Sequence, residues 1–133
     1  MPDRIALSFP RTASVASNFD YTTVHQRVVS PETGTLRAAY AFASTVTSNA
    51  TFPSRVDIYR QPSAPALGSN TATTVLVSPI TIPTDLTSAA GTIRASNARV
   101  SKGDMLELRT SVNATDGELT SVGGTVELER DPD

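Results

Sequence analysis

Leu106-Glu107-Leu108-Arg109 and Val126-Glu127-Leu128-Glu129 alternate apolar and charged side chains along the chain. Successive side chains of a β-strand point to opposite faces, so each run predicts a strand with one face buried and one in solvent. Between them lie Asp116-Gly117 and Gly123-Gly124, and Asp-Gly is a strong hairpin signal. The C-terminal part of the chain is therefore expected to be antiparallel β-structure.

Similar runs recur upstream, separated by turn residues at intervals of about ten to fifteen positions. They cover residues 19–29, 35–46, 55–61, 73–82 and 91–95. Pro79 has no amide hydrogen, which predicts an edge position or a bulge for the fourth run. In Val100-Ser101-Lys102-Gly103-Asp104, the glycine is the residue expected to need a positive φ. We predict an all-β fold, an antiparallel jelly-roll-like β-sandwich of about eight strands with an N-terminal extended arm.

The chain length suits one domain. Its 133 residues can bury a core without disulfides, and none can form because the chain has no cysteine. Residues 19–133 are predicted to form the single sandwich domain. Residues 1–18 are predicted to form the arm, because Ile5, Leu7 and Phe9 alternate and Pro10 then stops the run. Such a segment is too short to bury its own apolar face, so it must either lie on its own domain or pair with a neighbouring chain. For Ile5, Leu7 and Phe9 we favour an interface with a neighbouring chain, whose sheet the strand would extend.

The run 35–46 is rich in alanine, which favours a helix, but its large residues recur every second position, which favours a strand. One face would carry Leu36, Ala38, Tyr40 and Phe42. The small residues of the other face would let a second layer or subunit approach closely. The possible oligomer-interface residues are Arg37, Ala39, Ala41, Ala43 and Arg55.

The charge balance limits the partners. The formal net charge is -2, whereas binding to a nucleic-acid backbone needs clustered cations, so no nucleic-acid partner is expected. No stretch is long and apolar enough for a membrane span, and residues 1–11 lack the continuous apolar core of a secretory signal. Synthesis in the cytoplasm is therefore expected.

Catalytic and metal-binding signals are weak. His25 is the single histidine, and no G-x-S-x-G pattern marks a nucleophile. Asp104, Asp116 and Glu118 lie in turns, but their spacing does not match a calcium loop. We expect no catalytic residue, no metal and no cofactor, and therefore no enzyme. Tyr21, Tyr40 and Tyr59 would stack sugars only if they gathered on one exposed face.

Four segments resemble the small jelly-roll domains of tailed-phage virion proteins, which include capsid decoration (cement) proteins. They are Arg55-Val56-Asp57-Ile58-Tyr59-Arg60, Val75-Leu76-Val77-Ser78-Pro79-Ile80-Thr81-Ile82, residues 98–108 and Gly124-Thr125-Val126-Glu127-Leu128-Glu129. The resemblance covers residues 35–130.

This resemblance implies a virion structural role. A decoration protein of this kind binds the major capsid protein on the capsid exterior, stabilises the head and is frequently a homotrimer. The alternative is a tail- or fibre-associated receptor-binding or glycan-binding module. Both alternatives place the protein in the virion, and both depend on binding surfaces rather than catalysis.

Overall fold

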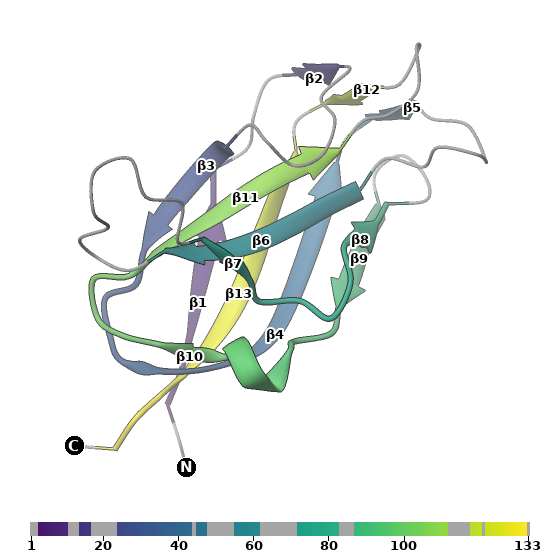
Figure 1. Ribbon diagram of the computed structural model, residues 1–133. Coiled ribbons are helices and arrows are strands. Elements are labelled where there is room, and N and C mark those ends of the chain that lie inside the picture. Colours follow the sequence, from purple (N-terminus) through teal and green to yellow (C-terminus); the bar gives the residue numbers. More distant parts are fainter. Residues whose placement is uncertain are drawn as a thin grey trace.

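Two antiparallel sheets pack face to face in a sandwich (Figure 1). The computed structural model describes residues 3–10, 14–16, 24–43, 45–47, 55–61, 72–82, 87–111, 118–120 and 122–132. These residues form thirteen strands. Six strands are only two or three residues long, so the sequence pattern, which needs several alternations to register, predicts fewer.

The first sheet has the order β1-β13-β4-β9. Its strands are β1 (Arg4–Phe9), β13 (Gly123–Arg130), β4 (Gly34–Ala43) and β9 (Thr87–Gly91). The short β10 (Arg99–Val100) pairs with the start of β4, where β9 does not reach. The run predicted at 91–95 is displaced, because the strand ends at Gly91 and a 3-10 helix, η1 (Ala95–Asn97), follows.

The second sheet has the order β3-β11-β6, with two short strands on the far side of β6. Its strands are β3 (Val24–Val29), β11 (Met105–Ser111), β6 (Arg55–Gln61), β7 (Thr73–Thr74) and β8 (Ile80–Thr81). Pro79 lies immediately before β8, at the edge that its missing amide favours. A small third sheet joins β2 (Ser14–Ala16), β12 (Glu118–Thr120) and β5 (Thr45–Thr47).

The core lies between the two large sheets. Leu106 and Leu108 enter it from β11, and Val126 and Leu128 enter it from β13, each with no exposed surface. Each such side chain contributes about 1.5–3 kcal/mol on burial. The alternation in these two runs is confirmed, although the charged face of β11 is itself covered, as described below.

The first strand belongs to this core rather than to an arm. β1 pairs with β13 over six consecutive residues, from Arg4 opposite Glu129 to Phe9 opposite Gly124. Leu7 and Phe9 are buried and Ile5 packs against the same core. The expectation that Ile5, Leu7 and Phe9 reach another chain is corrected: their apolar face is satisfied by their own domain, and the backbone of β1 is paired with β13.

A β-bulge in β4 shifts the predicted alternation of that strand, so Leu36 does not share a face with Tyr40 and Phe42. Glu127 lies opposite Ala38 and Leu128 lies opposite Leu36, which leaves Arg37 without a partner in the ladder. A bulge adds one residue and shifts the alternation. Leu36 therefore enters the core with the three small residues Ala39, Ala41 and Ala43, which are at most 1% exposed. These alanines meet the other sheet of the same chain and are not accessible to a second subunit.

The predicted turn before β11 is confirmed. Gly103 has a φ of 92°, a conformation that glycine adopts without steric cost. Its amide donates to the carbonyl of Ser30, and the amide of Ser101 donates to Oδ2 of Asp104. The turn therefore fixes the start of β11 against the end of β3.

Candidate binding surfaces

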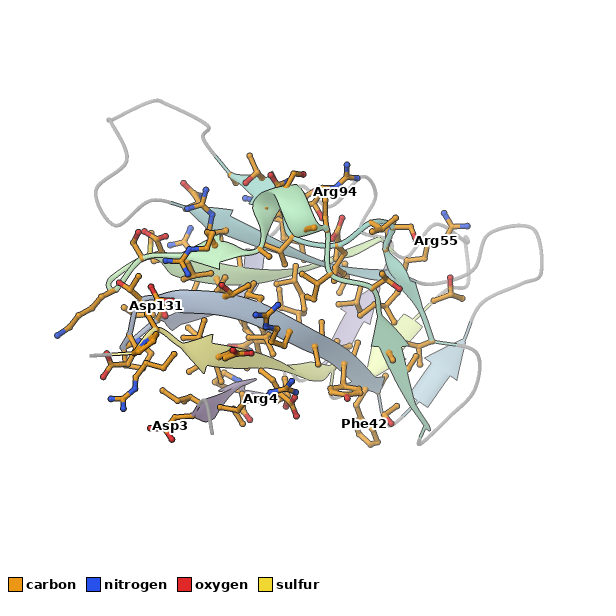
Figure 2. All side chains as sticks on the ribbon, turned by 90° about the horizontal axis from the view of Figure 1, so that it is seen from below. Asp3, Arg4, Phe42, Arg55, Arg94 and Asp131 are labelled. Atoms are coloured by element: carbon orange, nitrogen blue, oxygen red, sulfur yellow. The ribbon has the colours of Figure 1, made fainter. Side chains whose placement is uncertain are left out.

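The outward face of the β1-β13-β4-β9 sheet is the first candidate surface. Beyond the bulge, β4 turns Tyr40 and Phe42 outward, and Figure 2 shows Phe42 pointing away from the sandwich. Tyr40 is 41% exposed. Small residues of neighbouring strands surround it. We call this surface the Tyr40 face; its members are Ala6, Ser8, Tyr40, Phe42, Ser88, Ala90 and Thr125.

A hollow of about 350 Å³ opens on the Tyr40 face. Gly123 lies opposite Phe42 and has no side chain to fill the space beside that ring. The hydroxyls of Ser8 and Thr125 lie 3.3 Å apart at its margin. Among the described residues that line the hollow, none is charged.

The other half of the same sheet face is charged but neutralised. Nη1 of Arg4 lies 3.2 Å from Oε2 of Glu127, and Nε of Arg37 lies 2.7 Å from Oε2 of Glu129. Arg37, predicted as an interface residue, is therefore exposed and engaged in an ion pair across β4 and β13. Exposed pairs of this kind contribute little to stability, and they leave this half of the face without a net charge.

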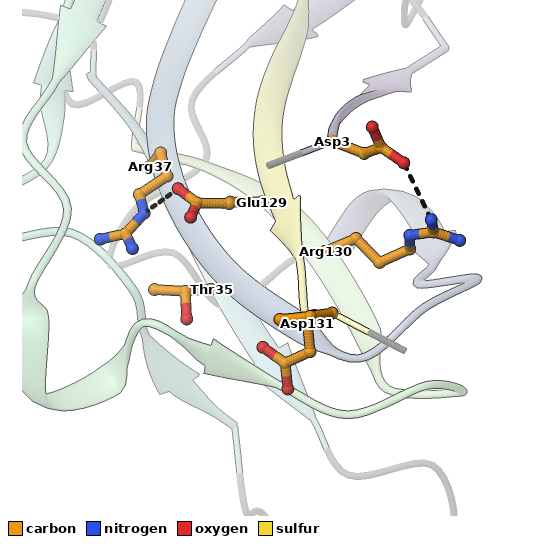
Figure 3. A pocket seen from close by; sticks show the side chains of 7 residues that line it. Asp3, Thr35, Arg37, Glu129, Arg130 and Asp131 are labelled. Carbon is orange, nitrogen blue, oxygen red and sulfur yellow. Dashed lines mark hydrogen bonds and ion pairs between the residues drawn. The ribbon is translucent and has the colours of Figure 1, made fainter. Parts of the chain in front are cut away.

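A second hollow, of about 450 Å³, lies where β1 begins and β13 ends (Figure 3). Arg130 binds Asp3 at 2.8 Å, and the two terminal nitrogens of Arg99 each lie 2.7 Å from a carboxylate oxygen of Asp131. The Arg99 guanidinium lowers the pKa of the Asp131 carboxyl. Because these charges pair with one another, they hold the ends of the strands together and leave no open ion-binding site among the described residues of the hollow.

A buried carboxylate lies on the outward face of the second sheet. Glu107 has no exposed surface. Its Oε2 accepts from Nε of Arg27 at 3.0 Å and from Nε2 of Gln61 at 3.2 Å, and its Oε1 accepts from Arg109. The Arg109 guanidinium lies 4.3 Å from the centre of the Tyr59 ring, within cation-π range. Two arginines and one glutamine, from three adjacent strands, thus cover Glu107.

Asp57, beside this cluster, is held by neutral groups. Thr74 donates to its Oδ1 at 2.7 Å, and the amide of Ile58 donates to the same oxygen at 2.8 Å. Burial raises the pKa of the Asp57 carboxyl, and the hydrogen bond from Thr74 opposes that rise. Asn97 in turn donates to the carbonyl of Thr74, which links η1 to the sheet. These contacts make Asp57 part of the fold's framework.

Several residues considered from the sequence are not brought together. Tyr40 lies on the first sheet and Tyr59 on the second, so they do not form one sugar-stacking face, and Tyr21 lies outside the described residues. Asp104 binds Arg60 at 3.1 Å. His25 lies in β3, but its side chain is outside the described set. In the part of the chain that the structure describes, no three acidic, histidine or cysteine side chains gather in a metal-binding group.

Arg55, the remaining predicted interface residue, is exposed at the start of β6. It lies on β6 of the second sheet (Figure 2), whereas the alanines with which it was grouped lie on β4 of the first sheet. Two features were missed from the sequence. The bulge that exposes Tyr40 leaves no clear mark in the sequence, and Glu107, between two leucines, has the pattern of a solvated residue. The one local signal for the ion pairs of Glu107 is Arg109, two positions later on the same face of the strand.

The arrangement of the two sheets decides the fold class. No protein-family model and no curated protein matches the chain. One solved structure, described as the structure of Eiger TNF from S. frugiperda, aligns with a TM-score of 0.51 and 16% identity, over 100% of this chain and 97% of that one. The fold is a jelly roll. At this identity the likeness extends to the fold alone, so function has to come from the surfaces.

Proposed function

We propose that this chain is a structural protein of a virion that decorates the capsid as a homo-oligomer. The observation that carries the proposal is the exposure of Tyr40 in the uncharged half of a sheet face. Self-association would take place through the Tyr40 face, and a homotrimer is the expected form. The protein would act by burying interface area between capsid subunits, without catalysis.

The composition of the Tyr40 face supports a protein interface. Interface cores are depleted of charge and enriched in tyrosine and phenylalanine. Large aromatic side chains also provide most of the binding energy when water is excluded around them. Tyr40 and Phe42 supply such anchors. Small neighbours such as Ala6 and Ala90 let a second surface approach closely, and the neutralised pairs at Arg4 and Arg37 avoid repulsion between copies.

The capsid as a partner is supported by the resemblance of residues 35–130 to decoration proteins. A jelly roll serves many functions, so the fold is compatible with this partner without selecting it. The outer capsid surface would be the site of attachment and the major capsid protein the binding partner. A receptor-binding or glycan-binding role is the competing possibility.

Light scattering of the purified chain and co-sedimentation with undecorated phage capsids test the proposal together. We expect an oligomer and saturable binding at a fixed ratio to the capsid protein. Tyr40→Glu should reduce the oligomer to monomers, whereas Arg4→Gln, on the charged half of the same face, should not. A monomeric wild-type chain would contradict self-association, and an oligomer that ignores capsids would contradict decoration.

The hollow on the Tyr40 face favours glycan binding as the second candidate. Pyranose rings stack on exposed aromatic rings, and hydroxyl groups of Ser8, Ser88 and Thr125 would supply hydrogen bonds beside Tyr40. A glycan array separates the two candidates. Saturable binding of a defined glycan that Tyr40→Ala abolishes, by a chain that does not sediment with capsids, would favour this second function.

A further inference from the structure

We propose that the outward face of the β3-β11-β6 sheet is a docking surface for a protein segment that carries a carboxylate beside apolar side chains. Two adjacent rows of cross-strand partners build it. Arg27, Glu107 and Tyr59 form one row, and Val29, Met105 and Gln61 form the next. We call the accessible members the Arg27 patch; they are Arg27, Val29, Tyr59, Gln61 and Met105.

Arg27 is oriented before any partner arrives. Its Nε is held by Oε2 of Glu107 at 3.0 Å, yet its side chain is 55% exposed. Among the described residues its two terminal nitrogens have no hydrogen-bond partner. Arginine presents these nitrogens as a planar fork that fits a carboxylate. Because Glu107 already restrains the side chain, less conformational entropy is lost when a partner binds.

The neighbouring row is apolar and exposed. Val29 is 60% exposed, and with Tyr40 and Val77 it makes up the large hydrophobic side chains that the described part of the chain leaves exposed. It lies two residues after Arg27, on the same side of β3, and opposite Met105. Arginine, methionine and tyrosine are enriched at protein interfaces. A cation flanked by apolar surface suits a peptide or protein partner.

The charge that this face shows to a partner is positive. Among the described residues of this face the carboxylates are Glu107 and Asp57, which are 0% and 4% exposed, whereas Arg27 and Arg55 are exposed. A nucleic-acid backbone would need many more free cations, and the chain as a whole has a formal net charge of -2. A protein carboxylate is therefore the anion that fits best.

The patch lies on the opposite sheet from the Tyr40 face. The two surfaces can be occupied at once, so a self-associated particle could still hold a partner. The inference goes beyond capsid decoration, because it follows from the second sheet alone and does not depend on the virion assignment.

Binding of the folded chain to a random glutamate-tyrosine copolymer tests the inference, with polyglutamate and heparin as comparison probes. The variants are Arg27→Gln and Val29→Ser. Arg4→Gln is the matched control, because Arg4 is 56% exposed and ion-paired at 3.2 Å, much as Arg27 is. Circular dichroism confirms that each variant is folded, and Val29→Ser keeps the Glu107 cluster intact.

We expect saturable, salt-sensitive binding to the copolymer that weakens about tenfold in both patch variants and is unchanged in Arg4→Gln. Polyglutamate should bind more weakly, because it lacks the apolar group. Absence of saturable copolymer binding, or an equal loss in Arg4→Gln, would overturn the proposal. Tighter binding of heparin that ignores Val29→Ser would also overturn it and assign the face to polyanions. Capsid binding that survives Arg27→Gln would leave decoration standing without this patch.

Discussion

A Cβ on Gly34 would collide with the backbone carbonyl oxygen of Glu129, so the backbone leaves room only for glycine at this position. Gly34 begins β4 where that strand is flanked by both β13 and β10. Gly34→Ala should therefore push the strands apart and lower the free energy of unfolding by about 1–3 kcal/mol. Urea denaturation followed by circular dichroism measures the loss. Ser88→Ala, at an exposed site on β9, is the control; equal midpoints for the two variants would show that β4 has room there.

Glu107→Gln should destabilise the protein far more than its position on an outward face suggests. The substitution removes the charge that Arg27 and Arg109 share, and breaking a buried ion pair costs about 3–5 kcal/mol. Glu127→Gln is the matched control, since Glu127 is 34% exposed and pairs with the exposed Arg4; its effect should stay below about 1 kcal/mol. Similar small losses in the two variants would mean that the Glu107 cluster is solvated.

Asp57→Asn should change stability in a pH-dependent way. Burial raises the pKa of Asp57 in the folded state above its ordinary value of 3.8. Between pH 3.8 and the raised pKa of the folded state, the folded protein holds the proton of Asp57 more tightly than the unfolded chain does. The free energy of unfolding therefore falls as pH rises through this range. Asparagine removes the effect. The stability of the variant relative to wild type should therefore be higher at pH 7 than near pH 3, in denaturation curves recorded across that range. A difference that is flat or falls with pH would contradict the direction.

Leu7→Ala separates a core strand from an arm. Leu7 is 9% exposed within the core cluster, so its truncation should cost about 2–5 kcal/mol. Ala6→Ser, on the outward side of the same strand, should be nearly neutral. Thermal unfolding of both variants gives the comparison. Unchanged stability of Leu7→Ala together with lost assembly would restore the arm interpretation.

The success of the sequence predictions depends on how local the deciding interaction is. Alternation at Leu106 and Leu108, and the glycine turn at Gly103, are set within a few residues and are readable in the sequence. The faces of β4 cannot be read from the sequence, because one bulge residue, Arg37, shifts the alternation. The position of that bulge depends on pairing with β13. The arm prediction at Leu7 failed for a related reason, since the strand that pairs with β1 lies near the other end of the chain.

The binding surfaces were harder to predict. Arg37 and Arg55 were grouped as possible oligomer-interface residues; both are exposed, but they lie on different sheets. Tyr40 was assigned to the face of Leu36, whereas the bulge exposes it. Glu107 has the local pattern of a solvated residue, and its burial depends on Arg27 and Gln61 from two other strands. Side-chain clusters assembled from distant strands leave little local signal.

The place of β13 in its sheet constrains the order of folding. It lies between β1 and β4, pairing with both, although it is the last strand in the chain. While the polypeptide is being synthesised, β1 and β4 cannot form a continuous sheet, because the strand that joins them has not left the ribosome. The sheet can close only after translation has passed β13, and such long-range pairing is intrinsically slow. Until then the edges of β1 and β4 that β13 later covers stay unpaired in the nascent chain, and unpaired strand edges are prone to aggregation.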